Sequence, residues 1–451
     1  MKNTKTSLSR RDFLKNAGLA TSLLILPSSV LGREGNTSPN SRIRVASIGV
    51  GNMGWGDVNG VADTGAEIVG LCDVDENTLN QAGEKFSSAK KFRDYREMLE
   101  KLGKEIDAVT ISTPDHMHFS ATMTAMMMKK HVYVQKPMAH TVDQCYRMAD
   151  AAKKYGIVSQ MGNQGHSNSH IRVAKEWYEA GLLGDVAEIS TWTNRAASHW
   201  PQGMNEYPPQ GNAPANLDWN LWLGPVADMP YHKDIAPFRW RAYYQFGCGA
   251  LGDMAVHIMD PANYIFDLGA PTKIEVDLFG AKPAKVSFPV KDKLTFYYPG
   301  NAKRGPIKIT WQEGPGSKPE TPKGLRGLDD NGGSILYGSK ETALLGSWGN
   351  SFDIAGDEAH FAALREKAPR PKYPRIKGTH YRNWIDAIKN GGKASSDFSY
   401  AAPFTANILI GTIAQRLGRN LEWDDKNRRF KNDDEANALL KAPAPRKGFL
   451  A

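Results

Sequence analysis

Cysteine is scarce in this 451-residue chain. The three cysteines, Cys72, Cys145 and Cys248, are widely separated and odd in number. This arrangement indicates neither a disulfide framework nor a CxxC metal motif. We interpret all three as buried apolar side chains.

A hydrophobic run long enough to span a bilayer is also missing from the N-terminal region. The run Ala17 to Leu26 is too short for that role. It follows the twin-arginine pattern "SRRDFLK" (9–15) and precedes Pro27 and small residues up to Gly32. We interpret residues 1–32 as a removable twin-arginine export signal and residues 33–41 as a linker. A disordered basic arm is the alternative, and no cysteine follows the run to carry a lipoprotein anchor.

Export through this route predicts a periplasmic or otherwise exported protein without membrane insertion after signal removal. Because the twin-arginine route carries folded proteins, a cofactor can be loaded before export. This predicts a tightly held cofactor, since soluble nucleotide is scarce outside the cytoplasm.

Blocks of basic residues are absent beyond the signal. The formal net charge is +9, but residues 1–32 contribute +4 of it, which leaves about +5 for the mature chain. No Lys/Arg block continues along a predicted helix, so nucleic-acid binding is not indicated. The composition, 41% hydrophobic and 23% charged, is that of a globular protein with room for two or three domains.

Short apolar runs alternate with helical segments from Arg42 onward. A helix is predicted over 141–156, where Thr141 and Gln144 have capping-box spacing and Gly156 ends the segment. Strands are predicted at 43–49, 67–73, 106–114, 131–137 and 157–163. This alternation predicts a doubly wound parallel sheet, a Rossmann domain over residues 42–165.

The pattern changes after about residue 165. A helix (171–181) and a strand (186–193) precede a loop of 194–245 rich in Pro, Gly, Asn and Trp. Further segments are three strands and two late helices, at 272–280, 293–299, 307–313, 379–392 and 401–418. We expect residues 166–451 to form a second α/β domain with a large open, mostly antiparallel sheet. The long loop is expected to be functional.

The segment Gly49-Val50-Gly51-Asn52-Met53-Gly54 reads GxGxxG between a predicted strand and a predicted helix. Glycines there let the backbone turn tightly and approach a pyrophosphate at the helix N-terminus. Asp73 ends the next strand, where its carboxylate can accept both ribose hydroxyls and would repel a 2′-phosphate. The sequence therefore predicts NAD binding and disfavours NADP. A glycine-rich structural turn is the alternative.

The segment "STPDHMH" (112–118) begins at the end of the strand predicted over 106–114, where loops of parallel sheets line the ligand crevice. We interpret Thr113, Pro114, His116 and His118 as cofactor contacts rather than catalytic groups. Capping or packing is the alternative for each histidine. Gln164, which follows the strand predicted over 157–163, is a further candidate cofactor contact.

Lys136 lies at the end of the strand predicted over 131–137, in the same crevice. Pro137 fixes its own φ and restricts Lys136 to extended backbone angles. The ammonium is therefore expected to point toward the nicotinamide. A solvated lysine at a strand end is the alternative.

The segment "GCGALGDMAVHIMD" (247–260) carries Asp253, His257 and Asp260 on one face of a predicted helix. A carboxylate four residues before an imidazole can orient it and tune its pKa for general-base catalysis. Metal binding and a structural Asp–His pair are the alternatives. Further ligands are too few to favour a metal.

Together these motifs resemble the Gfo/Idh/MocA oxidoreductases (glucose-fructose oxidoreductase, inositol dehydrogenase and relatives) over essentially the whole mature chain. The family's catalytic lysine, aspartate and histidine map to Lys136, Asp253 and His257. The family step Glu-Lys-Pro reads Gln135-Lys136-Pro137 here, which removes a charge beside the lysine. The resemblance implies an N-terminal Rossmann domain and a homo-oligomer, a dimer or tetramer, formed through the open sheet.

The resemblance implies an NAD-dependent oxidoreductase acting on a secondary hydroxyl of a sugar or glycoside, with C3 as a candidate. His257 would accept the hydroxyl proton, Lys136 would bind the oxygen, and Asp253 would steady the imidazolium. The candidate substrate contacts are Asn163, Gln164, His166, Trp192, Arg195, His199, Trp200, the stretch 218–225 and Asp260. An NAD-dependent glycosidase working by transient oxidation and elimination is the first alternative, and a non-catalytic sugar-binding protein is the second.

Overall fold

A computed structural model describes residues 42–450. The predicted signal (1–32) and linker (33–41) lie outside the described residues. Within residues 42–450, no helix is both long enough and apolar enough to cross a membrane.

The first sheet has six parallel strands in the order β3-β2-β1-β4-β5-β6. They are β1 (Arg44–Ile48), β2 (Glu67–Cys72), β3 (Lys90–Phe92), β4 (Ala108–Ile111), β5 (His131–Val134) and β6 (Ser159–Met161). The doubly wound sheet predicted from the alternating pattern is therefore confirmed. Strand β3 has only three residues, two of them exposed, and it carries no hydrophobic pattern that would predict it.

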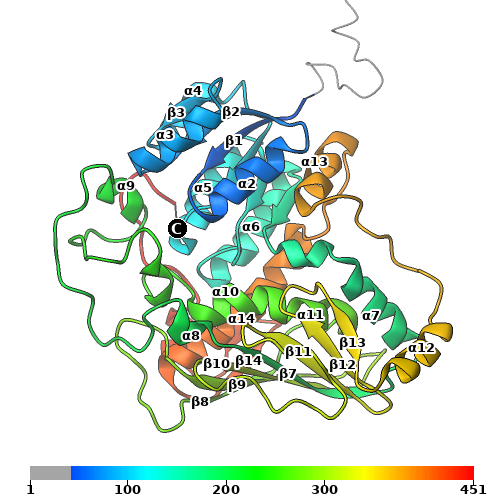
Figure 1. The fold of residues 1–451 in the computed structure, drawn as a ribbon. Coiled ribbons are helices and arrows are strands. Elements are labelled where there is room, and N and C mark those ends of the chain that lie inside the picture. The colour runs from blue at the N-terminus through cyan, green and yellow to red at the C-terminus, as the bar shows by residue number, and fades with distance from the viewer. Residues whose placement is uncertain (1–41, 451) are drawn as a thin grey trace, which may run out of the picture. The chain divides into compact units, whose positions relative to one another are not determined.

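Helices cover this sheet (Figure 1). They are α2 (Met53–Ala62), α3 (Glu76–Lys85), α4 (Tyr95–Leu102), α5 (Asp115–Met127) and α6 (Val142–Tyr155). Helix α6 has the predicted ends: the Thr141 hydroxyl accepts a hydrogen bond from the Gln144 amide, and Gly156 adopts a left-handed φ of 67°. A residue with a side chain would be strained at that C-terminal position.

The second sheet has nine strands in the order β13-β12-β11-β7-β10-β9-β8-β14-β15. They are β7 (Val186–Thr193), β8 (Lys273–Asp277), β9 (Asp292–Tyr298), β10 (Ile307–Glu313), β11 (Gly333–Gly338), β12 (Thr342–Gly346), β13 (Phe352–Ile354), β14 (Leu421–Asp424) and β15 (Arg429–Phe430). Strands β7 and β10 pair in parallel, and the other neighbours are antiparallel. The predicted large, mostly antiparallel sheet is confirmed.

The remaining helices surround the second sheet or return to the first. They are α7 (Ser169–Glu179), α8 (Arg195–Ser198), α9 (Trp219–Leu223), α10 (Gly249–Ile258), α11 (Asp260–Phe266), α12 (Glu358–Glu366), α13 (His380–Asn390), α14 (Phe398–Leu417) and α15 (Asp434–Ala438), with 3-10 turns η2 (Gln164–Ser167) and η3 (Arg239–Ala242). The long loop expected over 194–245 thus contains α8, α9 and η3.

Helix α13 belongs in sequence to the second half but packs on the first sheet beside α2 (Figure 1). Trp384 and Ile385 of α13 are fully buried in the same apolar cluster as Val45 of β1. Helix α14 packs against both α6 and α10. The two halves therefore share their interior, and α10 is held directly against the nucleotide half.

Candidate functional site

The glycine loop between β1 and α2 has room only for glycine. A Cβ on Gly54 would lie 2.1 Å from the Gly49 carbonyl oxygen, and a Cβ on Gly49 would lie 2.7 Å from the Ser112 oxygen. Gly49 also has a positive φ of 77°. The loop therefore passes closely over the end of β4 and leaves the N-terminus of α2 open to an anion.

A cavity of about 790 Å³ lies at the carboxyl ends of β1, β4 and β5. Its lining includes the glycine loop, the predicted contacts Asp73, Thr113, Pro114 and Lys136, and several residues of the second half. This size suits a small-molecule or cofactor site. The predicted position of the ligand crevice agrees with this geometry.

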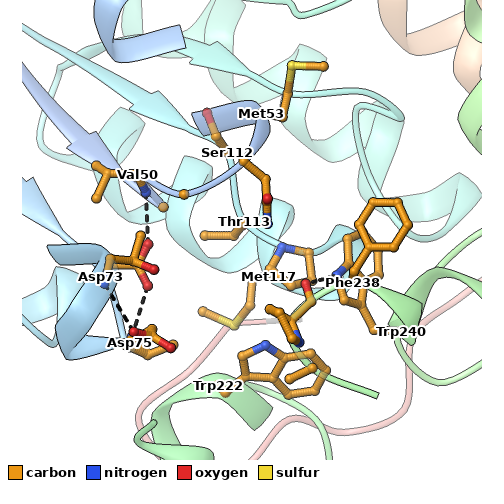
Figure 2. A pocket seen from close by; sticks show the side chains of 18 of the residues that line it. Val50, Met53, Asp73, Asp75, Ser112, Thr113, Met117, Trp222, Phe238 and Trp240 are labelled. Carbon is orange, nitrogen blue, oxygen red and sulfur yellow. Dashed lines mark hydrogen bonds between the residues drawn. The ribbon is translucent and has the colours of Figure 1, made fainter. Parts of the chain in front are cut away.

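Asp73 is fixed at the cavity by two backbone donors. Its carboxylate accepts from the Val50 and Asp75 amides, each at 2.9 Å, as Figure 2 shows. Burial raises the pKa of Asp73, although both hydrogen bonds oppose the shift. The carboxylate is thus held rigidly where a ribose would bind.

Residues of the second half cover the cavity. Leu217 forms an antiparallel bridge with Asp75, and Trp222, Phe238 and Trp240 form an aromatic wall across from Asp73 (Figure 2). The C-terminal segment adds Phe449, whose ring lies 4.1 Å from the Arg96 guanidinium. The covering residues therefore come from the long loop and from the chain end.

Lys136 meets Asp253 of α10 inside this cavity and forms an ion pair with it. Both side chains are buried, with exposed fractions of 7% and 2%. Two arginines flank the same carboxylate: Arg241 Nε lies 3.2 Å from it and Arg195 Nη1 lies 3.6 Å from it. Arg241 also binds the buried Asp115 at 2.9 Å.

These charges set the ionisation of the cluster. Burial by itself would raise the pKa of Asp253, but Arg241 and Lys136 overcome that effect and bring the pKa below its usual range. Burial lowers the pKa of Lys136, and Asp253 opposes this shift. The arrangement favours an ionised carboxylate beside an ammonium that releases a proton more easily than an exposed lysine would.

His257 lies one turn after Asp253 but is not paired with it. Neither ring nitrogen of His257 has a hydrogen-bond partner within residues 42–450, and the ring centre lies 4.3 Å from that of Trp348. The expected orientation of His257 by Asp253 is therefore not observed, and the cations Lys136, Arg241 and Arg195 lie around the carboxylate instead. Burial lowers the pKa of His257 well below its usual value, and the charge of Lys136 adds to this.

His257 is 2% exposed and is not one of the described residues that line the cavity. His257 lies on α10 one helical turn after Asp253, the residue that forms an ion pair with Lys136.

Asp260 has a different partner from the one that helical spacing suggested. It accepts from His166 Nδ1 at 2.9 Å and from the Tyr400 hydroxyl at 2.6 Å, and both Asp260 and His166 are buried. Asn163 is also buried and accepts a hydrogen bond from Ser396. None of these three predicted substrate contacts lines the cavity. Asp260 and His166 bond each other within the second half, and Asn163 links the nucleotide half to Ser396.

Gln164 lies apart from the cavity that Lys136 lines. It borders a separate cavity of about 320 Å³, together with Trp348 and Tyr381. Arg195, His199 and Trp200 do line the main cavity, as do Leu221 and Trp222 of the stretch 218–225. Some of the predicted aromatic and basic substrate contacts therefore line the main cavity, and others do not.

His116 and His118 do not line the cavity, contrary to the expectation that they contact the cofactor. The ring nitrogens of His116 lie 3.3 and 3.0 Å from the carbonyl oxygens of Phe246 and Trp222, and a neutral ring donates to one of them. The ring nitrogens of His118 lie 2.8 and 2.9 Å from the carbonyl oxygens of Pro137 and Thr113. The two histidines instead fasten α5 to the covering loop and to the segment that carries Lys136.

Trp192, expected as a sugar wall, is fully buried in the second sheet. Its ring packs with Leu325, Ile335 and Leu344, and its indole N–H donates to the Asp329 carbonyl at 2.8 Å. The reason is its strand position, since Trp192 faces the side of the sheet covered by residues around 325–329. This side chain therefore belongs to the core.

Sequence reasoning missed several residues of the site. Arg241 forms an ion pair with Asp253, and the Trp348 ring packs against that of His257. Phe449, from the C-terminal segment, lines the cavity. Asp57, in α2, binds Gln135 next to Lys136. The Arg-Trp-Arg run at 239–241 was the available signal for Arg241. Asp57 follows the glycine motif by three residues, but the motif assigns no role to that position. Trp348 and Phe449 lie far from any motif.

Two family models match this chain. The model for the oxidoreductase family with an NAD-binding Rossmann fold matches residues 43–163, and that for the C-terminal alpha/beta domain matches residues 167–300. The chain belongs to the Gfo/Idh/MocA oxidoreductase family.

Relatives with curated names are dehydrogenases and glycosidases. A levoglucosan dehydrogenase of Pseudarthrobacter phenanthrenivorans is 26% identical over 43% of this chain and 41% of its own length. A glycosyl hydrolase family 109 protein of Shewanella woodyi is 30% identical over 48% of this chain and 56% of its own length. An alpha-N-acetylgalactosaminidase of Shewanella oneidensis is 26% identical over 48% and 56%. The chain thus spans about half the length of the curated relatives it matches.

Solved structures with the same fold cover more of the chain. The WlbA dehydrogenase from Bordetella pertussis, in complex with NADH and UDP-GlcNAcA, has a TM-score of 0.58 at 17% identity, covering 85% of this chain and 99% of that one. A levoglucosan dehydrogenase, in complex with NADH and levoglucosan, has a TM-score of 0.57 at 18% identity, covering 84% and 99%. These similarities show that the fold is shared.

The described residues fit the dinucleotide of this family. At the three glycines of the loop a Cβ would clash with neighbouring protein atoms, which keeps the turn tight, and Asp73 is fixed beside the loop. Buried polar atoms at the other end have no hydrogen-bond partner in the part of the chain that the structure describes, on Thr113, Arg195, Trp200 and Asp253. Such atoms are normally satisfied in a folded protein, so their clustering indicates a polar ligand.

Proposed function

We propose that this protein oxidises a secondary hydroxyl of a sugar or glycoside, with NAD as the hydride acceptor and C3 as the candidate carbon. The observation that carries the proposal is the buried meeting of Lys136, from the nucleotide half, with Asp253, from the second half. Family membership supports the redox chemistry. The names of the relatives, a levoglucosan dehydrogenase and an alpha-N-acetylgalactosaminidase, support a carbohydrate substrate.

The residues that would hold the nucleotide are those of the glycine cradle and its rim. The loop Gly49–Gly54 would bind the pyrophosphate, Asp73 the adenosine ribose, and Thr113 and Pro114 the segment that follows. NAD, when bound, supplies a nicotinamide that takes the hydride from the substrate carbon. The acidic Asp73 favours NAD over NADP.

The protein's own side chains would handle the oxygen and its proton. Lys136 donates a hydrogen bond to the oxygen that becomes a carbonyl, and Asp253 holds that ammonium in place. His257, whose lowered pKa keeps it neutral, accepts the hydroxyl proton. The proposal requires the reacting hydroxyl to reach both Lys136, which lines the cavity, and His257, which lies one helical turn after Asp253.

A glycosidase that oxidises its substrate only transiently is the second candidate. Oxidation next to a C–H bond acidifies it, so elimination and water addition can release the aglycone with no net change in the nucleotide. The relatives named as glycosyl hydrolase family 109 proteins favour this candidate. Release of free sugar without net NADH would distinguish it from the dehydrogenase.

We also propose that the protein is exported and forms a homo-oligomer. The twin-arginine pattern in residues 9–15 supports export of the folded protein with its nucleotide inside. In that compartment, the bound nucleotide would be regenerated by reduction of a second sugar. We propose a homo-oligomer, a dimer or tetramer, that associates through the open face of the nine-stranded sheet.

The test begins with the purified full-length protein. Denaturation should release NAD, identified by mass, and incubation with a panel of glycosides should give a keto product two mass units lighter than its substrate. An NADP release, or no product and no free sugar from any carbohydrate tested, would contradict the proposal. Free sugar alone would favour the glycosidase.

A further inference from the structure

A second buried carboxylate, Asp57, lies beside the predicted active site without a cation bound to it. It is fully buried on α2, three residues after the last glycine of the loop. Three neutral side chains donate to it: Ser112 at 2.6 Å, Gln135 at 2.8 and 2.9 Å, and Tyr381 at 2.9 Å. These donors come from the ends of β4 and β5 and from α13.

Gln135 connects this carboxylate to Lys136. The Nε2 of Gln135 contacts both oxygens of Asp57, and its Oε1 accepts from the Lys136 backbone amide at 3.3 Å. The amide group is tightly confined, because a Cβ on Gly162 would lie 2.8 Å from it. Both ends of the Gln135 amide are therefore used, and the side chain has one orientation.

The contacts around Asp57 are all donors, so they suit an ionised carboxylate. Two donors reach each oxygen, Gln135 and Tyr381 on one and Gln135 and Ser112 on the other. Burial raises the pKa of Asp57, while the hydrogen bonds and the nearby charge of Lys136 lower it. Tyr133 and Tyr381, the other titratable neighbours, have a raised pKa and stay neutral.

We propose that Asp57 is a positioning residue that, through Gln135, fixes the backbone of Lys136 and so aims its ammonium at the reacting oxygen. This inference rests on the proposed function for the role of Lys136, but the Asp57–Gln135 linkage stands on its own contacts. It requires one charged and one amide partner at positions 57 and 135. Which position carries the charge should matter less than the pairing.

The test is a charge exchange between the two positions. Gln135→Glu alone places two carboxylates at contact distance, so the folded protein must bind an extra proton. One of the two carboxyl groups then has a higher pKa in the folded protein than in the unfolded chain. Its deprotonation at higher pH therefore lowers the stability of the folded protein. The free energy of unfolding of this variant relative to wild type should therefore fall between pH 5 and pH 8, together with affinity for NAD.

Adding Asp57→Asn to Gln135→Glu restores one amide and one carboxylate. This double variant should recover the wild-type pH profile of stability and NAD affinity. In turnover, Gln135→Glu should lose about a hundredfold in kcat at pH 8 and less at pH 5, as expected when a reacting group is misplaced. The double variant should stand within about tenfold of wild type.

Asp63→Asn serves as the matched control, since Asp63 is an exposed carboxylate at the end of the same helix. It should not alter any of these profiles. If Gln135→Glu is as stable and active as wild type at every pH, or if the double variant is no better than the single one, the proposal is wrong. Stability and NAD affinity are measured without a substrate, so failure to find a sugar would challenge the proposed function and leave this test intact.

Discussion

Two buried carboxylates, Asp253 and Asp57, are stabilised in different ways. Asp253 is surrounded by Lys136, Arg195 and Arg241, and its pKa lies below its usual range. Asp57 is surrounded by neutral donors, and its pKa is raised. Asp253 is thus one member of a cluster of charged side chains, whereas Asp57 is held by hydrogen bonds from neutral side chains.

The largest expected effect comes from Asp253→Asn. This change leaves Lys136, Arg195 and Arg241 facing one another without their shared counter-charge, so the ammonium is expected to turn away from the substrate. We expect kcat to fall by roughly a hundredfold to a thousandfold, as when an electrostatic group of an active site is removed. Steady-state kinetics on the identified glycoside measures this.

Asp277→Asn is the control for that measurement, because Asp277 is exposed at the end of β8. A kcat of Asp253→Asn within a few-fold of wild type would show that the cation cluster does not aim Lys136. In that case the contrast between the two carboxylates would have no catalytic meaning.

A third carboxylate, Asp73, sharpens the comparison because backbone amides alone hold it. Asp73→Asn removes the negative charge that should repel a 2′-phosphate. We expect the NAD affinity to fall by about tenfold, the equivalent of one hydrogen bond to a charged group. The NADP affinity should rise relative to that for NAD.

Titration of the nucleotide-free protein with each nucleotide checks this prediction. The measured quantity is the ratio of the two dissociation constants in wild type and variant. An unchanged ratio would mean that Asp73 does not face the ribose.

Buried histidines should affect the pH dependence of stability rather than turnover. Burial lowers the pKa of His116 to about 3 and that of His380 to about 4, against an unfolded value of about 6.5. Below pH 6.5 the unfolded chain binds protons that the folded chain does not, so stability falls as the pH falls. Each histidine should contribute roughly 1.4 kcal/mol per pH unit between its two pKa values.

Denaturant titrations between pH 7 and pH 5 measure this slope. In His380→Gln, the free energy of unfolding should change less steeply with pH. The slope should lose the contribution of one histidine, because glutamine does not titrate. A slope that is the same in wild type and variant would show that His380 is protonated in the folded protein.

The nucleotide half could be predicted closely from the sequence, and the second half only in outline. The glycine loop, Asp73 and Lys136 are local: each follows directly from a strand end, and parallel strand ends meet at one edge of the sheet. The partners of Asp253 and Asp260 could not be predicted, because helical spacing shows which residues share a face but not which distant side chains compete for them. In the structure, Lys136 and Arg241 form ion pairs with Asp253, and His166 pairs with Asp260.

The histidines and Trp192 were misplaced for a related reason. A histidine at a strand end looks the same in sequence whether its nitrogens face a ligand or backbone carbonyls, and the carbonyls that bind His116 lie more than a hundred residues away. Asp57 carried no signal, since its three partners come from distant segments.

The most direct test of the account is nucleotide reduction within one turnover by Lys136→Ala. The variant and wild type are both loaded with NAD, checked for equal nucleotide content, and mixed with the identified glycoside while the absorbance of reduced nicotinamide is followed. The account predicts rapid reduction in wild type and essentially none in Lys136→Ala, with NAD still bound. Reduction at the wild-type rate in Lys136→Ala would contradict it.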